Sequence, residues 1–162
     1  MNDGRRGRVA ISDASPADAE AILALQKLAY QSEAKLYDDW SLAPLTQSRE
    51  SLLGDIGNSV VLKATLGDRL VGSVRARQKG DTCAIARLFV HPDFQRRGIG
   101  SELLRRIEAR FKGASRFELF TGSRSEGNIR LYQRHGYSIT RTEAVSPAVS
   151  LTFLVKDAKE IP

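Results

Sequence analysis

The chain has 162 residues, of which 41% are hydrophobic and 27% charged, a length and composition that suit a soluble globular domain. No stretch reaches the roughly 18 consecutive apolar residues that a membrane-spanning helix requires, and the single cysteine, Cys83, excludes an internal disulfide. The net charge of +6 leaves two classes of partner open, nucleic acid and a small polyanionic cofactor.

The first ten residues contain arginines but no apolar segment after them, which is not the pattern of a secretory signal, so we expect a cytoplasmic protein. Two histidines and one cysteine make a poor set of zinc ligands, and no metal is expected. The sequence contains no internal repeat, low-complexity tract or proline-rich linker. We therefore expect residues 1–162 to form a single domain, with its core over about residues 8–156.

The chain begins with the pattern of a strand followed by a helix. The strand is expected over residues 8–12. Ser15, Pro16 and Asp18 then mark a helix start, as N-cap, first helical residue and capping-box residue. Apolar residues at helical spacing extend this first helix to about residue 35.

After an irregular stretch over residues 37–44, a second helix should begin beyond Thr46 and end near Gly54 or Gly57. Three strands separated by short turns follow, which predicts an antiparallel meander. They are expected over residues 60–65, 70–77 and 82–90.

The last part of the chain alternates helices and strands. We expect a helix at 98–111, a strand at 117–120, a helix at 125–134, and strands at 137–142 and 149–155. The whole order predicts a mixed sheet with helices on its faces, in an α/β or α+β sandwich.

The segment from residue 87 to residue 101 is the most informative for function. Here a strand runs into a turn, and the turn leads directly into a helix, whose N-terminal N–H groups form an anion site. Gly98 and Gly100 allow the backbone to approach a phosphate closely, and Arg96 and Arg97 add positive charge.

Two common phosphate-binding loops do not fit this turn. A Walker loop needs lysine and then serine or threonine after its last glycine, but Gly100 is followed by Ser101 and Glu102. A dinucleotide-binding loop needs three glycines after the first strand of a βαβ unit, and only two are present.

The spacing Gln95-x-x-Gly98-x-Gly100 resembles the acetyl-CoA pyrophosphate loop of the GNAT superfamily of N-acetyltransferases. The preceding residues 88–92 resemble the fourth strand of that family, and residues 128–137 resemble its Asn…Tyr-x-x-x-Gly-Phe/Tyr signature. The resemblance implies a GNAT-like α/β fold. Such a fold has a central mixed, mostly antiparallel sheet flanked by helices, with one splayed pair of parallel strands.

The resemblance also implies roles for individual residues. Backbone groups of Leu88, Phe89 and Val90 would pair with the pantetheine arm of acetyl-CoA. The pyrophosphate would be bound by backbone N–H groups of Arg96, Arg97, Gly98, Ile99, Gly100 and Ser101, with Gln95 at the entrance of the loop. Asn128 would contact the coenzyme arm, and Tyr132 would protonate the leaving thiolate as general acid.

The implied reaction is direct attack of a primary amine on the thioester, which also requires a group to accept the proton of the amine. Many relatives supply a glutamate from the fourth strand, but residues 82–88 contain no carboxylate. Glu33, Asp38 and Asp39 remain candidates for this role. The acceptor pocket is expected from residues 20–57 and from the loop near Ser146.

The sequence leaves several alternatives open. The acceptor is expected to be a small-molecule amine or a protein amine, and a homodimer is possible, while no membrane partner is expected. A non-catalytic acyl-CoA-binding sensor is favoured by the missing strand carboxylate and opposed by the presence of Tyr132. A nucleic-acid-binding protein is opposed by the absence of a uniformly basic helix or of an arginine–aromatic stripe. Cys83 is interpreted as a small buried residue rather than a nucleophile.

Overall fold

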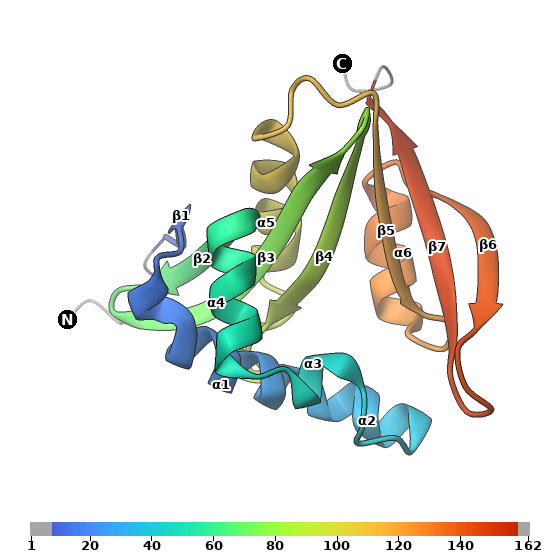
Figure 1. The fold of residues 1–162 in the computed structure, drawn as a ribbon, viewed down its shortest axis with the longest axis horizontal. Helices are drawn as coiled ribbons and strands as arrows, with labels where there is room; N and C mark the ends of the chain where they lie inside the picture. Colours follow the sequence, from blue (N-terminus) through green and yellow to red (C-terminus); the bar gives the residue numbers. More distant parts are fainter. Residues whose placement is uncertain (1–7, 159–162) are drawn as a thin grey trace.

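A seven-stranded sheet in the order β1-β2-β3-β4-β5-β7-β6 forms the centre of the protein, in a computed structural model that describes residues 8–158 (Figure 1). Neighbouring strands are antiparallel, except that β4 and β5 are parallel. The strands are β1 (Ala10–Asp13), β2 (Val60–Leu66), β3 (Arg69–Lys79), β4 (Thr82–Val90), β5 (Arg116–Gly122), β6 (Ser138–Ala144) and β7 (Ser150–Asp157). The mixed, mostly antiparallel sheet predicted from the sequence is confirmed.

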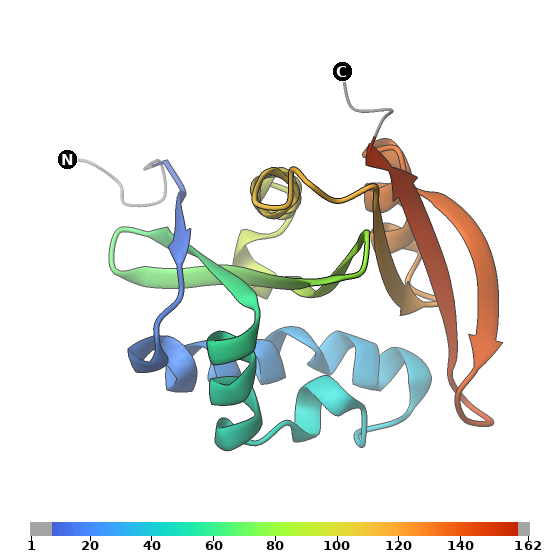
Figure 2. The ribbon, with the colours of Figure 1, turned by 45° about the horizontal axis from the view of Figure 1, so that its top comes forward.

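Helices cover both faces of this sheet. They are α1 (Ala19–Ala29), α2 (Gln31–Tyr37), α3 (Ala43–Thr46), α4 (Arg49–Asn58), α5 (Ile99–Ala109) and α6 (Glu126–Arg134), with 3₁₀ turns at Pro16–Asp18 and Pro92–Phe94. Figure 2 shows α1 and α4 on one face and α5 on the other. Because both faces are covered, the middle of β3, residues 71–76, is buried without alternation.

The predicted order of elements is confirmed, with two local differences in the first third of the chain. The helix expected to run to about residue 35 ends at Ala29, and Tyr30 separates it from α2. Within the predicted loop region, a short helix, α3, begins at Ala43. At the helix start, the backbone N–H of Ser15 donates to Asp18 (2.8 Å), which also pairs with Lys63 (2.9 Å).

β4 and β5 separate soon after they begin, as Figure 1 shows. They pair only through Thr82 with Arg116, Cys83 with Phe117, and Ala84 with Glu118. Beyond this point β4 stays with β3 and β5 stays with β7. The predicted splayed pair is therefore present, and the edge of β4 that faces β5 is left without a strand partner from Ile85 onward.

A β-bulge interrupts β4 at the wide part of this opening. Ser73 of β3 pairs with Phe89, whereas Arg75 pairs with Ala86, so β4 contains one residue more than β3 between these pairs. Within the bulge, Arg87 has a φ of 53°, in the left-handed region that few side chains adopt. A bulge of this kind redirects side chains locally.

A buried polar network attaches the helices of one face to β3. Arg75 forms an ion pair with Asp55 (2.7 Å) and donates a hydrogen bond to Gln26. Gln26 in turn donates to the carbonyl oxygen of Pro44 (2.8 Å), which fixes the short helix α3 against α1. The buried guanidinium therefore has its own counter-ion within the fold.

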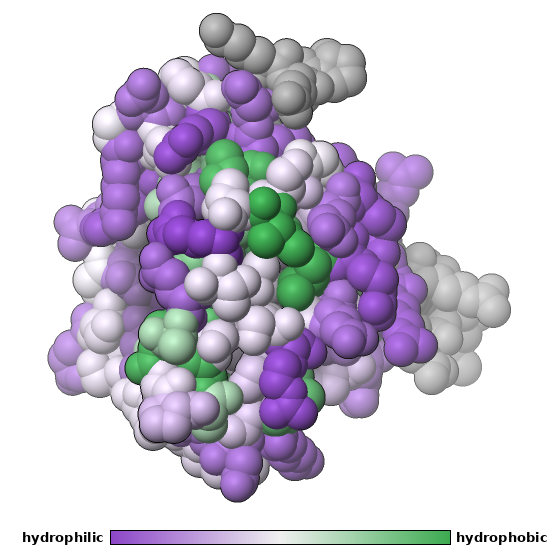
Figure 3. Space-filling view, turned by 90° about the vertical axis from the view of Figure 1, so that its right-hand side faces the viewer, coloured by the Kyte–Doolittle hydropathy of each residue, from purple (hydrophilic) through white to green (hydrophobic). Residues whose placement is uncertain are grey.

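The edge of the sheet formed by β6 is exposed to solvent, as is every residue of that strand. The exposed apolar side chains on this side are Ile139 of β6, Phe120 of β5 and Val145 just after β6. Figure 3 looks onto this side of the molecule and shows apolar patches among polar residues.

Candidate active site

Two adjoining cavities lie at the opening between β4 and β5. The first has a volume of about 600 Å³ and is bounded by β4, the turn before α5, the start of α5 and α6. The second, of about 390 Å³, lies between β4, β5, α6 and the α2–α3 region. Tyr30, Glu33, Leu88 and Asn128 line both cavities, so the two spaces meet at these side chains.

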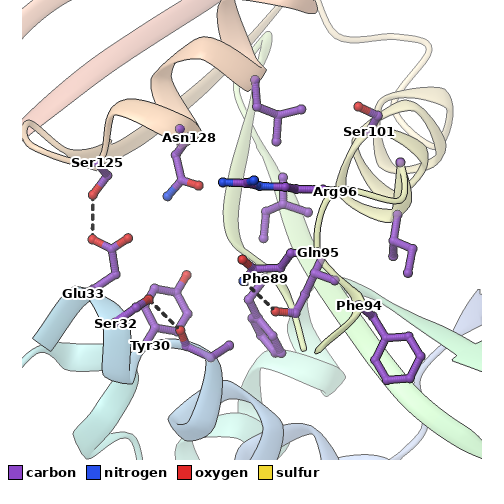
Figure 4. A pocket seen from close by; sticks show the side chains of 18 of the residues that line it. Tyr30, Ser32, Glu33, Phe89, Phe94, Gln95, Arg96, Ser101, Ser125 and Asn128 are labelled. Atoms are coloured by element: carbon purple, nitrogen blue, oxygen red, sulfur yellow. Dashed lines mark hydrogen bonds between the residues drawn. The ribbon is translucent and has the colours of Figure 1, made fainter. Parts of the chain in front are cut away.

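The first cavity brings together nearly all the residues predicted to bind the coenzyme. It is lined by Leu88, Phe89, Val90, Gln95, Arg96, Gly98, Ile99, Gly100, Ser101 and Asn128. Arg97 is not among the lining residues, and its guanidinium lies over the ring of Phe94, 5.1 Å from the ring centre. Figure 4 shows Arg96 extending across the cavity toward Asn128.

The turn before α5 has the backbone geometry of an anion site. Arg96 and Gly98 have positive φ values of 62° and 80°, and Gly98 is the N-cap of α5. The first N–H groups of a helix have no partner within the helix, and they carry its partial positive charge. Gln95 closes the turn by donating a hydrogen bond to the carbonyl oxygen of Val90 (3.3 Å).

Ser101, in the first turn of α5, is connected to the end of α6. Its hydroxyl lies 2.9 Å from Nε2 of His135. Burial lowers the pKa of His135, which favours the neutral imidazole near pH 7. This contact joins the two helices that border the first cavity.

Glu33 lines both cavities, and Figure 4 shows its carboxylate directed toward Ser125. Its carboxylate accepts a hydrogen bond from the hydroxyl of Ser125, just before α6. Ser125 also lies 3.1 Å from the hydroxyl of Tyr37, which accepts the backbone N–H of Arg124 (2.8 Å). The interruption between α1 and α2 at Tyr30 thus precedes the short helix that holds Glu33. The Glu33 carboxylate is fixed near the start of α6 by its hydrogen bond with Ser125.

Of the three carboxylates proposed from the sequence, only Glu33 lines a cavity. Asp38 and Asp39 line neither one. Asp39 instead accepts hydrogen bonds from the backbone and hydroxyl of Ser41 (2.9 and 2.6 Å), in a local turn.

Tyr132, the predicted general acid, lines the second cavity and not the first. It is buried, and burial raises the pKa of its phenol. The phenol therefore stays protonated at neutral pH, as a proton donor must. Asn128, one turn earlier on α6, donates to the hydroxyl of Thr121 (3.2 Å) and lies between the two cavities.

The second cavity is lined mainly by apolar side chains, from both regions in which the acceptor pocket was expected. The residues from these regions are Tyr30, Glu33, Tyr37, Leu42, Ala43, Pro44, Val145 and Val149. The sequence did not single out Arg87, which also lines this cavity. Its only sequence signal was a basic residue within an otherwise apolar strand.

Gly122 leaves space for the side chain of Tyr37. Tyr37 contacts Ser125, which donates the hydrogen bond to Glu33. A Cβ atom at Gly122 would lie 2.0 Å from the hydroxyl oxygen of Tyr37. We expect Gly122→Ala to displace Tyr37 and to lower the free energy of unfolding by about 1–3 kcal/mol, the usual cost of overpacking. Urea unfolding measures this loss. Gly54→Ala is the control, because a Cβ there meets no atom within 4 Å, and equal stability of the two variants would contradict the packing explanation.

Two other kinds of site receive no support from residues 8–158. Cys83 is buried, and burial raises the pKa of its thiol to about 12, which keeps it as the unreactive thiol. In this part of the chain there is no group of three or more His, Cys, Asp or Glu side chains that could hold a metal ion. Among the helices of residues 8–158, we find no candidate for a membrane span.

Comparison with known proteins gives a family match and a set of similar folds. The model of the Acetyltransferase (GNAT) family matches residues 20–137. The PaiA N-acetyltransferase from Thermoplasma acidophilum, solved in complex with coenzyme A, has a TM-score of 0.76 at 17% identity, over 93% of this chain and 99% of that one.

Two further solved structures have a similar fold. The ribosomal-protein-S18-alanine N-acetyltransferase from Escherichia coli has a TM-score of 0.77 at 15% identity, over 93% of this chain and 94% of that one. YncA from Salmonella typhimurium, solved with its cofactor acetyl-CoA, has a TM-score of 0.74 at 20% identity, over 96% of this chain and 97% of that one. No curated protein matches the sequence.

Proposed function

We propose, from the premise that the chain belongs to the GNAT acetyltransferase family, that it transfers an acetyl group from acetyl-CoA to a primary amine. The observation that carries this proposal is the meeting of two different cavities at the splayed strands. One has a helix N-terminus and an arginine for phosphate groups, and the other is apolar with a few polar side chains. Such a pair of spaces suits a coenzyme and an acceptor.

The charge and the exposed backbone groups of the first cavity support its assignment to the coenzyme. The N-terminus of α5 and the side chain of Arg96 would bind the pyrophosphate. The unpaired edge of β4 would bind the amide groups of the pantetheine arm, because its backbone has no β5 partner beyond Ala84. These groups would leave the thioester where the two cavities join, near Leu88 and Asn128.

The reaction forms one bond and breaks one. The nitrogen of the acceptor amine attacks the thioester carbon, a C–N bond forms, and the C–S bond breaks. Tyr132 would give its phenolic proton to the leaving sulfur and then be reprotonated from solvent. Its pKa is raised by burial, and burial likewise disfavours a charged thiolate, so the leaving sulfur also favours its protonated form there.

We assign the acceptance of the amine proton to Glu33, since it is the carboxylate at the junction of the cavities. Glu33→Gln keeps the size of the side chain and its contact with Ser125, but removes the base. We expect kcat to fall by about 10²-fold or more, with unchanged affinity for acetyl-CoA. The measurement is thiol release at saturating acetyl-CoA.

Glu126→Gln is the matched control, because Glu126 lies on α6 nearby but is exposed to solvent. Its kcat should stay within about twofold of the wild type. Full activity of Glu33→Gln would remove Glu33 from the mechanism and leave proton acceptance to water.

The function itself is tested by titrating the protein calorimetrically with acetyl-CoA and CoA, and then by measuring thiol release with a panel of amines. Saturable binding together with amine-dependent release is the expected result. Binding without release for any amine would favour the alternative of a non-catalytic acyl-CoA sensor. Failure of the folded protein to bind either ligand would refute the proposal.

A further inference from the structure

We infer that the acceptor is a small amine that also carries a carboxylate on an apolar body, as an apolar amino acid does, and that Arg87 binds this carboxylate. The inference rests on the proposed function, because it assigns a substrate class to the second cavity. It is carried by the position of Arg87, by its lack of an ion-pair partner within residues 8–158, and by the charge of Glu33 in the same cavity.

The bulge in β4 gives Arg87 an unusual backbone conformation. Its φ of 53° lies in the left-handed region, which is costly for a residue with a long side chain. The extra residue of β4 breaks the regular pairing with β3 at this point and places Arg87 in the wall of the second cavity. A strained bulge in the wall of a cavity, at a basic residue, is typical of a binding site.

Arg87 has no counter-ion in the described part of the chain. Within residues 8–158 it forms no ion pair, and no hydrogen bond of its side chain is found. Arg75, the neighbouring cation, is by contrast paired with Asp55 at 2.7 Å. The Asp55 carboxylate is thus already engaged, and Arg87 has no counter-ion among the residues that the structure describes. A half-buried cation in an apolar cavity gains free energy when an anion binds beside it.

The charge of Arg87 is close enough to two nearby groups to influence their pKa values. Burial lowers the pKa of Arg75, and the positive charge of Arg87 lowers it further. Burial raises the pKa of Tyr30, and the charges of Arg87 and Arg75 oppose that rise. Tyr30 lines both cavities, so the field of Arg87 reaches the place where they join.

Glu33 supplies the opposite charge in the same cavity. The two side chains do not form an ion pair, although both line this space in the described structure. An acceptor with an ammonium group at Glu33 and a carboxylate at Arg87 would satisfy both charges. The intervening wall is apolar, with Ile85, Leu119 and Val149, so the body of the acceptor should be apolar too.

The coenzyme does not provide this anion. Its phosphates are assigned to the turn before α5 and to Arg96, in the first cavity, which Arg87 does not line. A volume of about 390 Å³ holds a free amino acid together with the reacting acetyl group. A protein N-terminus, whose first carboxylate is converted to an amide, would leave Arg87 unpaired.

The test compares matched ligands that differ only in the carboxylate. Phenylalanine and phenethylamine form one pair, leucine and 3-methylbutylamine form another, and phenylalaninamide stands for a peptide N-terminus. Each is titrated calorimetrically into the protein saturated with CoA, where no reaction takes place. We expect the two amino acids to bind at least about tenfold more tightly than their partners, as a charge-assisted pair predicts.

Arg87→Asn should abolish this preference and leave the binding of phenethylamine unchanged. Asparagine is chosen because it tolerates the left-handed region. Arg77→Asn, which removes the same charge from an exposed position of β3, should preserve the preference. If Arg87→Asn does not fold, the comparison of phenylalanine with its amide in the wild type still decides the question.

Equal binding of the matched ligands by the wild type would overturn the inference, and so would a preference that survives in Arg87→Asn. Binding of CoA without binding of any of these amines would overturn it as well. None of these results affects the proposed function, which fails separately if CoA does not bind or no amine releases thiol. If CoA does not bind, titration of the same ligands into the free protein still tests whether Arg87 binds the carboxylate.

Discussion

Replacing Gly98 by aspartate should weaken the binding of acetyl-CoA by about 100-fold or more, while replacing it by asparagine should preserve most of the affinity. Gly98 is the N-cap of α5, with a φ of 80°. Aspartate and asparagine both tolerate this conformation, and their side chains have the same shape. They differ only in the charge placed where the pyrophosphate is expected, so the pair isolates electrostatic repulsion from backbone strain.

Calorimetric titration with acetyl-CoA measures the effect, and circular dichroism checks that each variant is folded. A Cβ at Gly98 meets no atom within 4 Å, so neither variant should disturb the packing of the turn. Gly113→Asp provides a control for added charge, since Gly113 is also open and does not line the cavity. Equal affinities of the aspartate and asparagine variants would show that no phosphate lies at this turn.

Removing the hydroxyl of Tyr132 should lower kcat by about 10²- to 10³-fold without changing the affinity for acetyl-CoA, because the proton donor to the leaving sulfur is lost. The pKa of Tyr132 is raised by burial above the ordinary value of about 10. A raised pKa preserves the protonated form, so kcat of the wild type should not fall on the alkaline side below about pH 10 through this group.

Tyr132→Phe is best compared with Tyr137→Phe, which makes the same change in a neighbouring ring 6.0 Å away. The hydroxyl of Tyr137 donates to Glu108 (2.7 Å) in the buried core. Loss of this hydroxyl should lower the free energy of unfolding, measured in urea, and leave kcat near the wild-type value, measured by thiol release. A kcat of Tyr132→Phe close to that of the wild type would exclude this phenol as the acid.

Features set by neighbouring residues could be predicted from the sequence. The turn before α5 and the start of that helix depend on Gly98 and on the residues beside it, and the structure places both at a cavity. The order of strands and helices likewise followed from hydrophobic periodicity. The side chain of Arg97 could not be placed, because its position over Phe94 depends on packing beneath the turn.

The acceptor side depended on contacts between distant parts of the chain. The sequence offered Glu33 as one of three candidate carboxylates, and its place at both cavities depends on the helix break at Tyr30 and on Ser125, 92 positions along the chain. Arg87 gained its place from a register shift between β3 and β4, for which periodicity gives no signal. Such features need the three-dimensional arrangement, since the residues that create them are far apart in sequence.

The short pairing of β4 with β5 also bears on the stability of the folded protein. The two halves of the sheet are joined along this seam by only three residue pairs. A coenzyme bound in this opening would contact β4 on one side and α6 on the other, and would link the two halves of the sheet. Its binding energy then adds to the folding equilibrium, by about 2.7 kcal/mol at a ligand concentration of about 100 times Kd. Acetyl-CoA would thereby raise the resistance of the protein to unfolding, in addition to serving as its substrate.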